Sequence, residues 1–522
     1  MSVNKRYVTI VSLVVALGGF LMGFDASVIS GVVKFIDIEF DLTKLELGWA
    51  VSCLTLSATI AMIMAGPLSD RYGRKPLLQI SAIMYLISAI TSAIAPTFWF
   101  LVAARMLGGF GVGASLILAP MYIAEISPAN LRGRMVSFNQ LNIVIGISVA
   151  FFTNYLILKF GNSGAGWAHF LKLDDYNWRW MLGLESFPAL FYLISLIFVP
   201  ESPRWLVMKG DEIGGLDILS RVNGQERAGQ EVKAIRNSMA SHVETKKVPI
   251  KSLFKPALRL VLLIGIMIAI LQQITGINSV FFYAPMIFEQ SGIGTDASFS
   301  QAILVGLTNL VFTVVAMLLI DKLGRKPLLG FGVTGIALAM FLLAYGFNSA
   351  TYKLTDESIT GLPDKIEKES LMTISNKTYD SDVDYKAALA VQLDPQTVKE
   401  YESVLISSAI KMNPYLILIG IIGFVASFAV SLGPVMWVMF SELFPNWIRG
   451  LAISFAGFIN SAISFLVQLL FPWELANMGS TVTFLIYGIL AVAGLVFILS
   501  MVPETKGKSL EELESILVKE HD

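Results

Sequence analysis

Long apolar runs alternate with short polar segments along almost the whole chain. A helix of about 20 mostly apolar residues is long enough to cross a bilayer. Such runs occupy roughly residues 7–33, 48–69, 77–96, 98–122, 135–158, 178–199, 258–288, 297–320, 327–348, 413–440, 450–472 and 480–502. The pattern therefore predicts an all-α integral membrane protein with twelve transmembrane helices.

Basic residues fall in every second connection between these runs. They cluster in NKR (4–6), DRYGRK (70–75), LRGR (131–134), the segment 201–257, DKLGRK (321–326), NWIRG (446–450) and ETKGK (504–508). Loops rich in lysine and arginine face the cytoplasm. We therefore expect a multi-pass protein of a cell membrane (plasma or inner) with both termini in the cytoplasm.

The composition supports this prediction. Of the 522 residues, 55% are hydrophobic and only 15% are charged, whereas soluble domains carry about 25% charged residues. The net charge of −1 gives no indication of a nucleic-acid partner, and the single Cys53 excludes an intrachain disulfide. The first apolar run is too long for the core of a signal peptide, so we expect it to remain as a span.

Two polar segments interrupt the apolar pattern. Residues 201–257 are compatible with helices and lie on the predicted cytoplasmic side. Residues 351–412, called the insertion below, lie on the predicted outer side. They hold eleven acidic residues against seven lysines and include the sequon Asn376-Lys377-Thr378. We interpret the insertion as a solvated cap or as a partly disordered loop, with a binding role as a further alternative.

Two motifs occur twice. GPLSDRYGRKPLL (66–78) recurs as AMLLIDKLGRKPLL (316–329), and AEISPANLRG (124–133) recurs as SELFPNWIRG (441–450). The separation grows from 251 residues in the first pair to 317 in the second, a difference of 66 that is about the length of the insertion. The chain is therefore predicted to consist of two six-helix halves.

The predicted parts are 1–200 (first half), 201–257 (cytoplasmic helical linker), 258–502 (second half, with the insertion) and 503–522 (cytoplasmic tail). Duplicated halves are typical of transporters, whose substrate site lies near the midplane where the halves meet.

Three lone charged residues lie inside predicted spans of the first half: Asp25, Arg105 and Glu185. Each lies seven or eight residues from an end of its span, roughly 10–12 Å at the helical rise per residue. One explanation is that they reach the outer headgroups by snorkelling. The other is functional, because charge inside a membrane is costly. A carboxylate whose pKa responds to burial and to a neighbouring guanidinium can carry a proton.

The spans of the second half carry uncharged polar side chains and a tryptophan: Gln272, Gln273, Asn278, Asn309, Trp437 and Asn460. Amides that donate and accept suit a polyhydroxyl ligand, and a tryptophan packs on the C–H surface of a sugar. The alternative is hydrogen bonding between helices. Gln272 and Asn278 are six positions apart, so they share a face only if Gly276 loosens the turn.

The sequence indicates no catalytic chemistry. No nucleophile, phosphate loop or metal-ligand cluster is recognisable, and the chain has only three histidines. We therefore predict that the protein is not an enzyme and has no catalytic, cofactor or metal site.

Taken in order along the chain, the motifs resemble those of a sugar porter of the major facilitator superfamily. They are DRYGRK, RGR (132–134), PESPRW (200–205), QQITGIN (272–278), GRKPLL (324–329), GPVMWV (433–438), SELFPNWIRG and PETKGKSLEE (503–512). The resemblance extends through all twelve spans and is strongest to bacterial proton-coupled symporters of the xylose type. It implies the major facilitator fold and sugar transport by alternating access.

The resemblance also implies roles for particular residues. Asp25 matches the acid that proton-coupled members carry in the first span, and Arg105 and Glu185 match its partners. The six polar and aromatic residues of the second half match sugar-binding positions. A cytoplasmic gate of salt bridges between the halves is implied for Asp70, Arg74, Glu125, Arg132, Glu201, Asp321, Arg325, Glu442 and Arg449. The alternative is that the basic members only anchor the loops in the cytoplasm.

Three positions depart from the family's pattern. Ile147 stands where a sugar-contacting Gln is common, Phe282 where a Tyr is frequent, and Ser461 where a Trp often follows the span-11 amide. Because these changes would reshape the pocket, they count against an ordinary glucose or xylose specificity.

The leading hypothesis is proton:sugar symport with Asp25 as the proton carrier. The expected partners are a monosaccharide or related polyol, protons and the lipid bilayer, and we expect a monomer. The alternatives are a uniporter that keeps the acid for structural reasons and a sugar sensor that does not transport. The tail after Val502 has about 20 residues, which counts against a sensor because sensors commonly carry long cytoplasmic tails.

Overall fold

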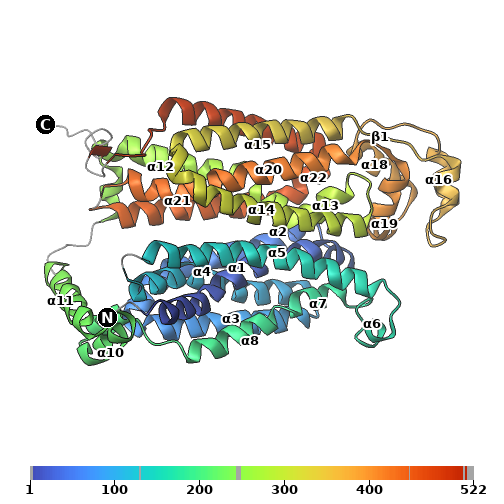
Figure 1. Cartoon of the computed structure of the whole chain (residues 1–522). Helices are drawn as coiled ribbons and strands as arrows, with labels where there is room; N and C mark the ends of the chain where they lie inside the picture. The colour runs from blue at the N-terminus through green and yellow to red at the C-terminus, as the bar shows by residue number, and fades with distance from the viewer. Residues whose placement is uncertain (1–3, 129–130, 243–248, 446, 509–511, 514–522) are drawn as a thin grey trace. The chain divides into compact units, whose positions relative to one another are not determined.

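The computed structural model describes residues 4–128, 131–242, 249–445, 447–508 and 512–513. Within these ranges the chain is almost entirely helical (Figure 1). Eleven helical segments are long and apolar enough to cross a membrane. The predicted fold class, an all-α membrane protein, is confirmed.

The helices up to the end of the polar linker follow the predicted spans closely. They are α1 (Lys5–Glu39), α2 (Lys44–Tyr72), α3 (Arg74–Ala93), α4 (Phe98–Ile126), α5 (Arg132–Gly161), α6 (Gly166–Phe170), α7 (Asn177–Gly183) and α8 (Ser186–Ile197). The linker forms α9 (Pro203–Met208), α10 (Glu212–Asn223), α11 (Gln225–His242) and the 3₁₀ helices η1 (Ile250–Phe254) and η2 (Pro256–Leu258).

The apolar helices after the linker are α12 (Arg259–Ile274), α13 (Ile277–Glu289), α14 (Thr295–Leu323), α15 (Arg325–Asn348), α20 (Pro414–Val430), α21 (Leu432–Leu443) and α22 (Arg449–Met501). At 53 residues, α22 would be about 80 Å long, far more than one crossing requires. Its backbone leaves the helical region at Gly479 (φ 79°, ψ 164°). The two pieces correspond to the predicted spans 450–472 and 480–502, which explains why twelve predicted spans give eleven segments.

The insertion is a folded cap. It contains β1 (Thr351–Tyr352), α16 (Asp356–Thr360), α17 (Lys368–Leu371), η3 (Met372–Ile374), α18 (Asp382–Gln392), α19 (Pro395–Ala409) and β2 (Ile410–Lys411). The two short strands pair antiparallel and close its ends, with Thr351 opposite Lys411. Its buried side chains form a separate apolar cluster, in which the rings of Tyr352 and Tyr385 stack 5.3 Å apart. The alternative of a partly disordered loop is therefore wrong.

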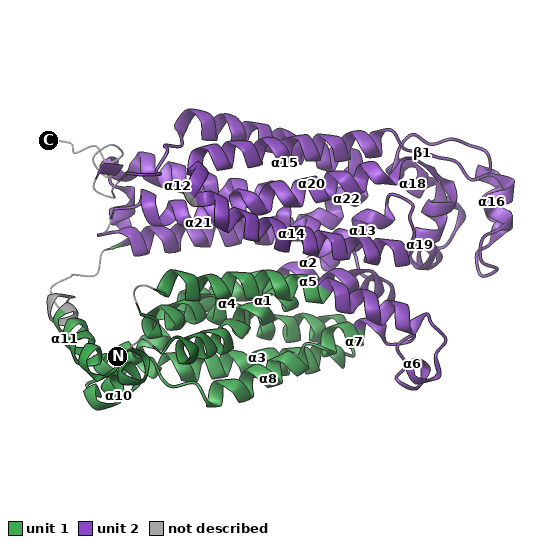
Figure 2. Cartoon of the chain, viewed as in Figure 1, with its two compact units in different colours: residues 1–27, 53–150, 179–249 green, residues 28–52, 151–178, 250–522 purple. Residues whose placement is uncertain are grey.

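The chain forms two compact units (Figure 2). Unit 1 comprises residues 1–27, 53–150 and 179–249, and unit 2 comprises 28–52, 151–178 and 250–522. The boundaries cut through α1, α2, α5 and α7, so residues 28–52 and 151–178 belong with the second part of the chain. The division into two repeated six-helix halves stays a prediction, since these units follow contacts and not the repeat.

Candidate functional site

Asp25, Arg105 and Glu185 are buried together in unit 1. Arg105 Nη1 lies 3.4 Å from Asp25 Oδ1, and Arg105 Nη2 donates to the backbone oxygen of Asp25 at 3.4 Å. Glu185, immediately before α8, interacts electrostatically with both residues. None of the three residues is more than 3% exposed. Such burial does not favour the snorkelling alternative, in which the charged ends lie in the headgroups.

This cluster contains two carboxyl groups and one guanidinium. Within the described residues, Asp25 Oδ2, Arg105 Nε and Glu185 Oε1 have no hydrogen-bond partner. A buried group with unbalanced charge is costly, and two ionised carboxylates beside one cation leave a net charge of −1. Binding one proton makes the cluster neutral. The arrangement is therefore suited to taking up and releasing a single proton.

Four of the six predicted sugar-binding residues form one hydrogen-bonded network in unit 2. Gln273 Nε2 donates to Asn460 Oδ1 at 3.1 Å and to Gln272 Oε1 at 3.2 Å. Asn460 Nδ2 donates to Gln272 Oε1 at 2.8 Å, and Asn278 Nδ2 donates to Gln273 Oε1 at 2.9 Å. These amides supply donors and acceptors close together, as recognition of a hydroxylated ligand requires.

Ser464 also belongs to the network, although it was not among the predicted residues. Its hydroxyl accepts from Asn278 Nδ2 at 2.6 Å and from Gln468 Nε2 at 2.8 Å. Ser464 and Gln468 follow Asn460 at intervals of four residues on α22. Spacing of four places residues on one helix face, a signal that would have predicted both.

The other two predicted residues form no hydrogen bond with this network within the described part of the chain. Asn309 is buried in α14, and its side chain forms no hydrogen bond to the four amides. Trp437 of α21 is 44% exposed and packs edge-on against Phe440, with ring centroids 5.8 Å apart. Of the positions that depart from the family, Phe282 is buried in α13, whereas Ile147 and Ser461 are half-buried.

A break in the backbone brings these amides together. α12 ends at Ile274 and α13 begins at Ile277, with Gly276 between them in the left-handed region (φ 86°). The break allows Gln272 and Asn278 to reach the same network although they are six residues apart. A second break lies between α20 and α21, where Gln272 Nε2 donates to the backbone oxygen of Leu432 at 3.0 Å. Interrupted helices are a common setting for transporter binding sites.

We expect Gly276→Ala to destabilise the protein and weaken ligand binding. A left-handed conformation costs a residue with a Cβ about 1–2 kcal/mol. The added Cβ would also lie 2.7 Å from two ring carbons of Tyr487. Thermal unfolding in detergent measures the effect. Gly450→Ala is the matched control, because a Cβ at that helical position meets nothing within 4 Å. Equal melting temperatures for the two variants would contradict this account of the break.

The DRYGRK motif forms an ion-pair cluster within unit 1. Arg74 Nε and Nη2 donate to the two carboxylate oxygens of Glu125, each at 3.0 Å, and Nη1 lies 3.0 Å from Asp70 Oδ1. The backbone N–H groups of Arg74 and Lys75 donate to Glu201 Oε1 at 3.0 and 3.2 Å. Glu201 thus binds the first amides of α3, where a negative charge is favourable.

The same cluster recurs within unit 2. Arg325 Nη2 and Nε donate to the two carboxylate oxygens of Glu442 at 2.8 and 3.2 Å. Glu504 accepts from the backbone N–H groups of Arg325 and Lys326, each at 3.1 Å. Glu504 therefore corresponds to Glu201. Glu504 was not among the predicted residues, but both acids follow a proline after an apolar span, a signal that would have predicted it.

The two remaining arginines of the predicted gate, Arg132 and Arg449, bond to nearby backbone oxygens. Arg132 Nε donates to the oxygen of Ala124 and Arg449 Nε to that of Phe444, each at 3.0 Å. The side chain of Asp321 lies outside the described residues. The ion pairs of these motifs each lie within one unit, so the implied salt bridges between the halves stay a prediction.

Comparison with known proteins shows extended similarity. Residues 11–362 and 398–517 match the family model "Sugar (and other) transporter". The chain is 33% identical to the arabinose-proton symporter of Bacillus subtilis, over 99% of this chain and 96% of that protein. It is also 33% identical to the D-xylose-proton symporter of Escherichia coli, over 98% and 96%. Identity to the glucose transport protein of Synechocystis sp. is 32%, over 98% and 97%.

Solved structures agree with these relatives. The inward-open conformation of the xylose transporter XylE from E. coli matches with a TM-score of 0.74 at 32% identity. The match covers 98% of this chain and 100% of that chain. The likeness therefore extends over almost the whole length of each protein.

Proposed function

Because the chain belongs to the sugar (and other) transporter family, we propose that it is a proton:sugar symporter in which Asp25 carries the proton. Membership of this family confirms the resemblance found in the motifs. It also means that the protein is a transporter and not an enzyme.

The observation that carries the proposal is the buried group of two acids and one base. Protonation of Asp25 removes the charge opposite Arg105 Nη1, 3.4 Å away, and weakens the contact between α1 and α4. The weaker contact favours the conformational change of the sugar-loaded protein. Deprotonation of Asp25 on the other side of the membrane then restores the ion pair with Arg105. While Asp25 is protonated, the negative charge of Glu185 still partly balances the positive charge of Arg105. The relatives named as arabinose-proton and D-xylose-proton symporters support this coupling.

The amide network of unit 2 is the proposed sugar site. Gln272, Gln273, Asn278 and Asn460 satisfy one another in a chain of hydrogen bonds, and sugar hydroxyls can replace these bonds by donating and accepting at once. The half-exposed Trp437 offers a flat apolar face to the ring. The substrate class is a monosaccharide or a related polyol, and relatives named for arabinose, xylose and glucose support it.

We place both termini and the DRYGRK and DKLGRK motifs on the cytoplasmic side and the insertion on the outer side of a cell membrane. The alternation of basic loops supports this orientation. Transport then proceeds by alternating access, with the sugar and the proton crossing together.

Purified protein reconstituted in liposomes tests the proposal. A screen of pentoses, hexoses and polyols by tryptophan fluorescence first identifies a ligand. Uptake of that ligand is then measured with and without an imposed pH gradient, acidic on the side of sugar addition. A symporter accumulates the sugar above its external concentration only with the gradient. Uptake that stops at equal concentrations supports a uniporter, and binding without uptake or counterflow supports a sensor.

A further inference from the structure

The insertion contributes Lys386, Lys399 and Glu402 to a cluster of charged side chains that the proposed coupling does not use. Eight charged side chains, paired as cation and anion, lie in unit 2. They are found where the insertion meets the end of α1, the start of α2 and the end of α13. The cations are Lys34, Lys44, Lys386 and Lys399, and the anions are Asp37, Asp41, Glu289 and Glu402. Four positive charges thus balance four negative ones.

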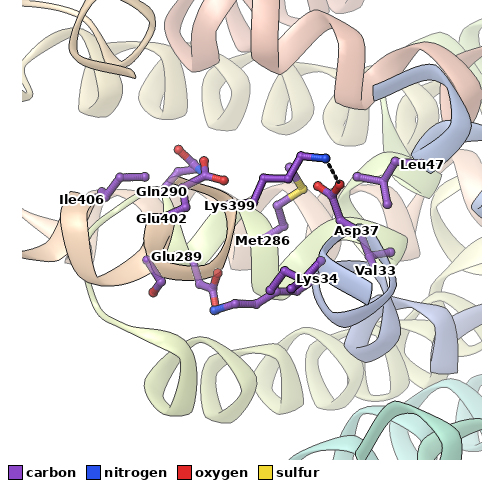
Figure 3. A pocket seen from close by; sticks show the side chains of 12 residues that line it. Val33, Lys34, Asp37, Leu47, Met286, Glu289, Gln290, Lys399, Glu402 and Ile406 are labelled. Carbon is purple, nitrogen blue, oxygen red and sulfur yellow. Dashed lines mark hydrogen bonds and ion pairs between the residues drawn. The ribbon is translucent and has the colours of Figure 1, made fainter. Parts of the chain in front are cut away.

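α19 of the insertion binds the connection between α1 and α2. Lys399 Nζ lies 2.6 Å from Asp41 Oδ1 and 3.4 Å from Asp37 Oδ1, and it donates to the oxygen of Leu42 at 2.9 Å. Figure 3 shows Lys399 reaching Asp37 across the pocket between the two elements. The other oxygen of Asp37 pairs with Lys44 at 3.1 Å. The start of α2 is thereby included in the cluster.

A second set of bonds joins α1 to the helices after the linker. Lys34 Nζ lies 2.9 Å from Glu289 Oε1 at the end of α13 and donates to Thr295 Oγ1 of α14 at 2.6 Å. These charges are substantially sheltered, with side-chain exposures of 23% for Lys34 and 10% for Glu289. Sheltered charges are screened less by salt than fully exposed pairs.

The insertion itself is fixed to the second part of the chain. Lys386 and Gln290 both bond to Glu402 Oε1, at 2.7 and 3.2 Å. Asp382 accepts from the backbone N–H and the hydroxyl of Ser480 at 3.1 and 2.9 Å, at the start of the second piece of α22. The insertion therefore has its own apolar core and is bonded to the residue after α13 and to α22.

The pocket within this cluster is not a sugar site. Its free space is about 40 Å³, enough for a few water molecules but not for a monosaccharide. Its charged lining residues are engaged in ion pairs with one another or, for Glu402, with Lys386. The geometry is that of a closed seam between α1, α2 and the insertion.

We infer that the insertion is a latch that holds the ends of α1 and α2 against the second half and must release them whenever the transport path opens on that side. The inference rests on the proposed alternating access. Residues 363–397, within the insertion, lie outside the family match, and Lys386 is the one charged residue of the cluster that falls among them.

The charge of Glu402 within the latch is expected to be insensitive to pH in the range where the transporter works. Burial acts to raise the pKa of Glu402, but the positive charges of Lys386 and Lys44 outweigh burial and lower the pKa to about 2. A carboxyl group with a lowered pKa contributes fully above its ordinary pKa and loses that contribution as the pH falls from there through the lowered value. The charge of Glu402, which Lys386, Lys44 and Gln290 face, therefore stays constant between about pH 5 and pH 8.

Cysteine labelling tests the latch. The background is Cys53→Ser with Met286→Cys, because Met286 lines the pocket beside Lys399 (Figure 3). The rate of maleimide reaction in detergent reports how often the seam opens. Lys399→Gln is expected to raise this rate roughly five- to tenfold by removing two ion pairs and one hydrogen bond. Lys365→Gln, an exposed lysine of the same insertion, is the matched control and should leave it unchanged.

A second variant separates release from unfolding of the insertion. Asp37→Asn removes the partner on α1 and leaves every residue of the insertion intact, so it should also accelerate labelling. High salt should accelerate labelling of the background protein more than that of Lys399→Gln. Equal rates in all variants, or acceleration by Lys365→Gln as well, would overturn the latch.

The same protein in liposomes separates this inference from the proposed symport. Faster labelling of Lys399→Gln in a protein without pH-driven sugar accumulation supports the latch and rejects the coupling. Normal accumulation with unchanged labelling supports the coupling and rejects the latch.

Discussion

Reconstituted Asp25→Asn protein is expected to lose accumulation of sugar against its gradient completely while still exchanging sugar in counterflow. Asparagine has nearly the same shape as aspartate and can still accept from Arg105, but it cannot release a proton. With sugar bound, the loaded protein can change conformation as the protonated wild type does. Return of the empty protein is impaired because the ion pair with Arg105, 3.4 Å long in the wild type, does not form again.

Uptake of labelled sugar with an imposed pH gradient, and counterflow without one, measure the two properties in the same liposomes. Asp296→Asn is the matched control, since Asp296 is an exposed acid in the first turn of α14. It should behave as wild type in both assays. If Asp25→Asn accumulated sugar as well as wild type, Asp25 would not be the proton carrier.

Gln273→Ala is expected to lower sugar affinity about 10- to 100-fold, which corresponds to about 1.4–2.8 kcal/mol. Gln273 bonds to Gln272, Asn460 and Asn278. Its removal deletes a donor and an acceptor for the sugar and leaves buried groups of its neighbours without a partner. Sugar-induced tryptophan fluorescence gives the dissociation constant.

Gln225→Ala, at an exposed position in α11, controls for the loss of a glutamine side chain. A thermal-unfolding measurement on both variants shows whether the fold is retained. At saturating sugar, Gln273→Ala should still couple sugar to protons, because Asp25 and Arg105 are unchanged. Unaltered affinity in a folded Gln273→Ala protein would place the sugar site elsewhere.

The sequence alone predicts the membrane spans because span length is set by the thickness of the bilayer and the apolar runs reach it. The lone charges at Asp25, Arg105 and Glu185 stand out for the same reason, since charge is rare in such runs. For the break at Gly276, the sequence predicts only that Gln272 and Asn278 share a face if the glycine loosens the turn. A glycine permits the left-handed conformation without imposing it, and the network around Gln272 shows that the chain adopts it here.

The fold of the insertion and its ion pairs with α1 could not be predicted from the sequence. Its buried side chains, among them Ile359, Leu371 and Leu405, lie in short helices whose apolar positions are scattered among charges. Caps such as Asp394, which accepts from the N–H of Thr397, mark helix starts but not how the helices pack. The ion pair of Lys399 with Asp41 spans 358 residues, and no local pattern specifies a pairing over that distance.

Proton movement triggered by sugar tests the central claim most directly. Wild-type protein in liposomes that hold a pH-sensitive dye is given its sugar at equal pH inside and outside, with no other driving force. The account predicts acidification of the interior that depends on the sugar concentration and is absent in Asp25→Asn liposomes. Sugar entry into wild-type liposomes without any acidification would contradict proton symport.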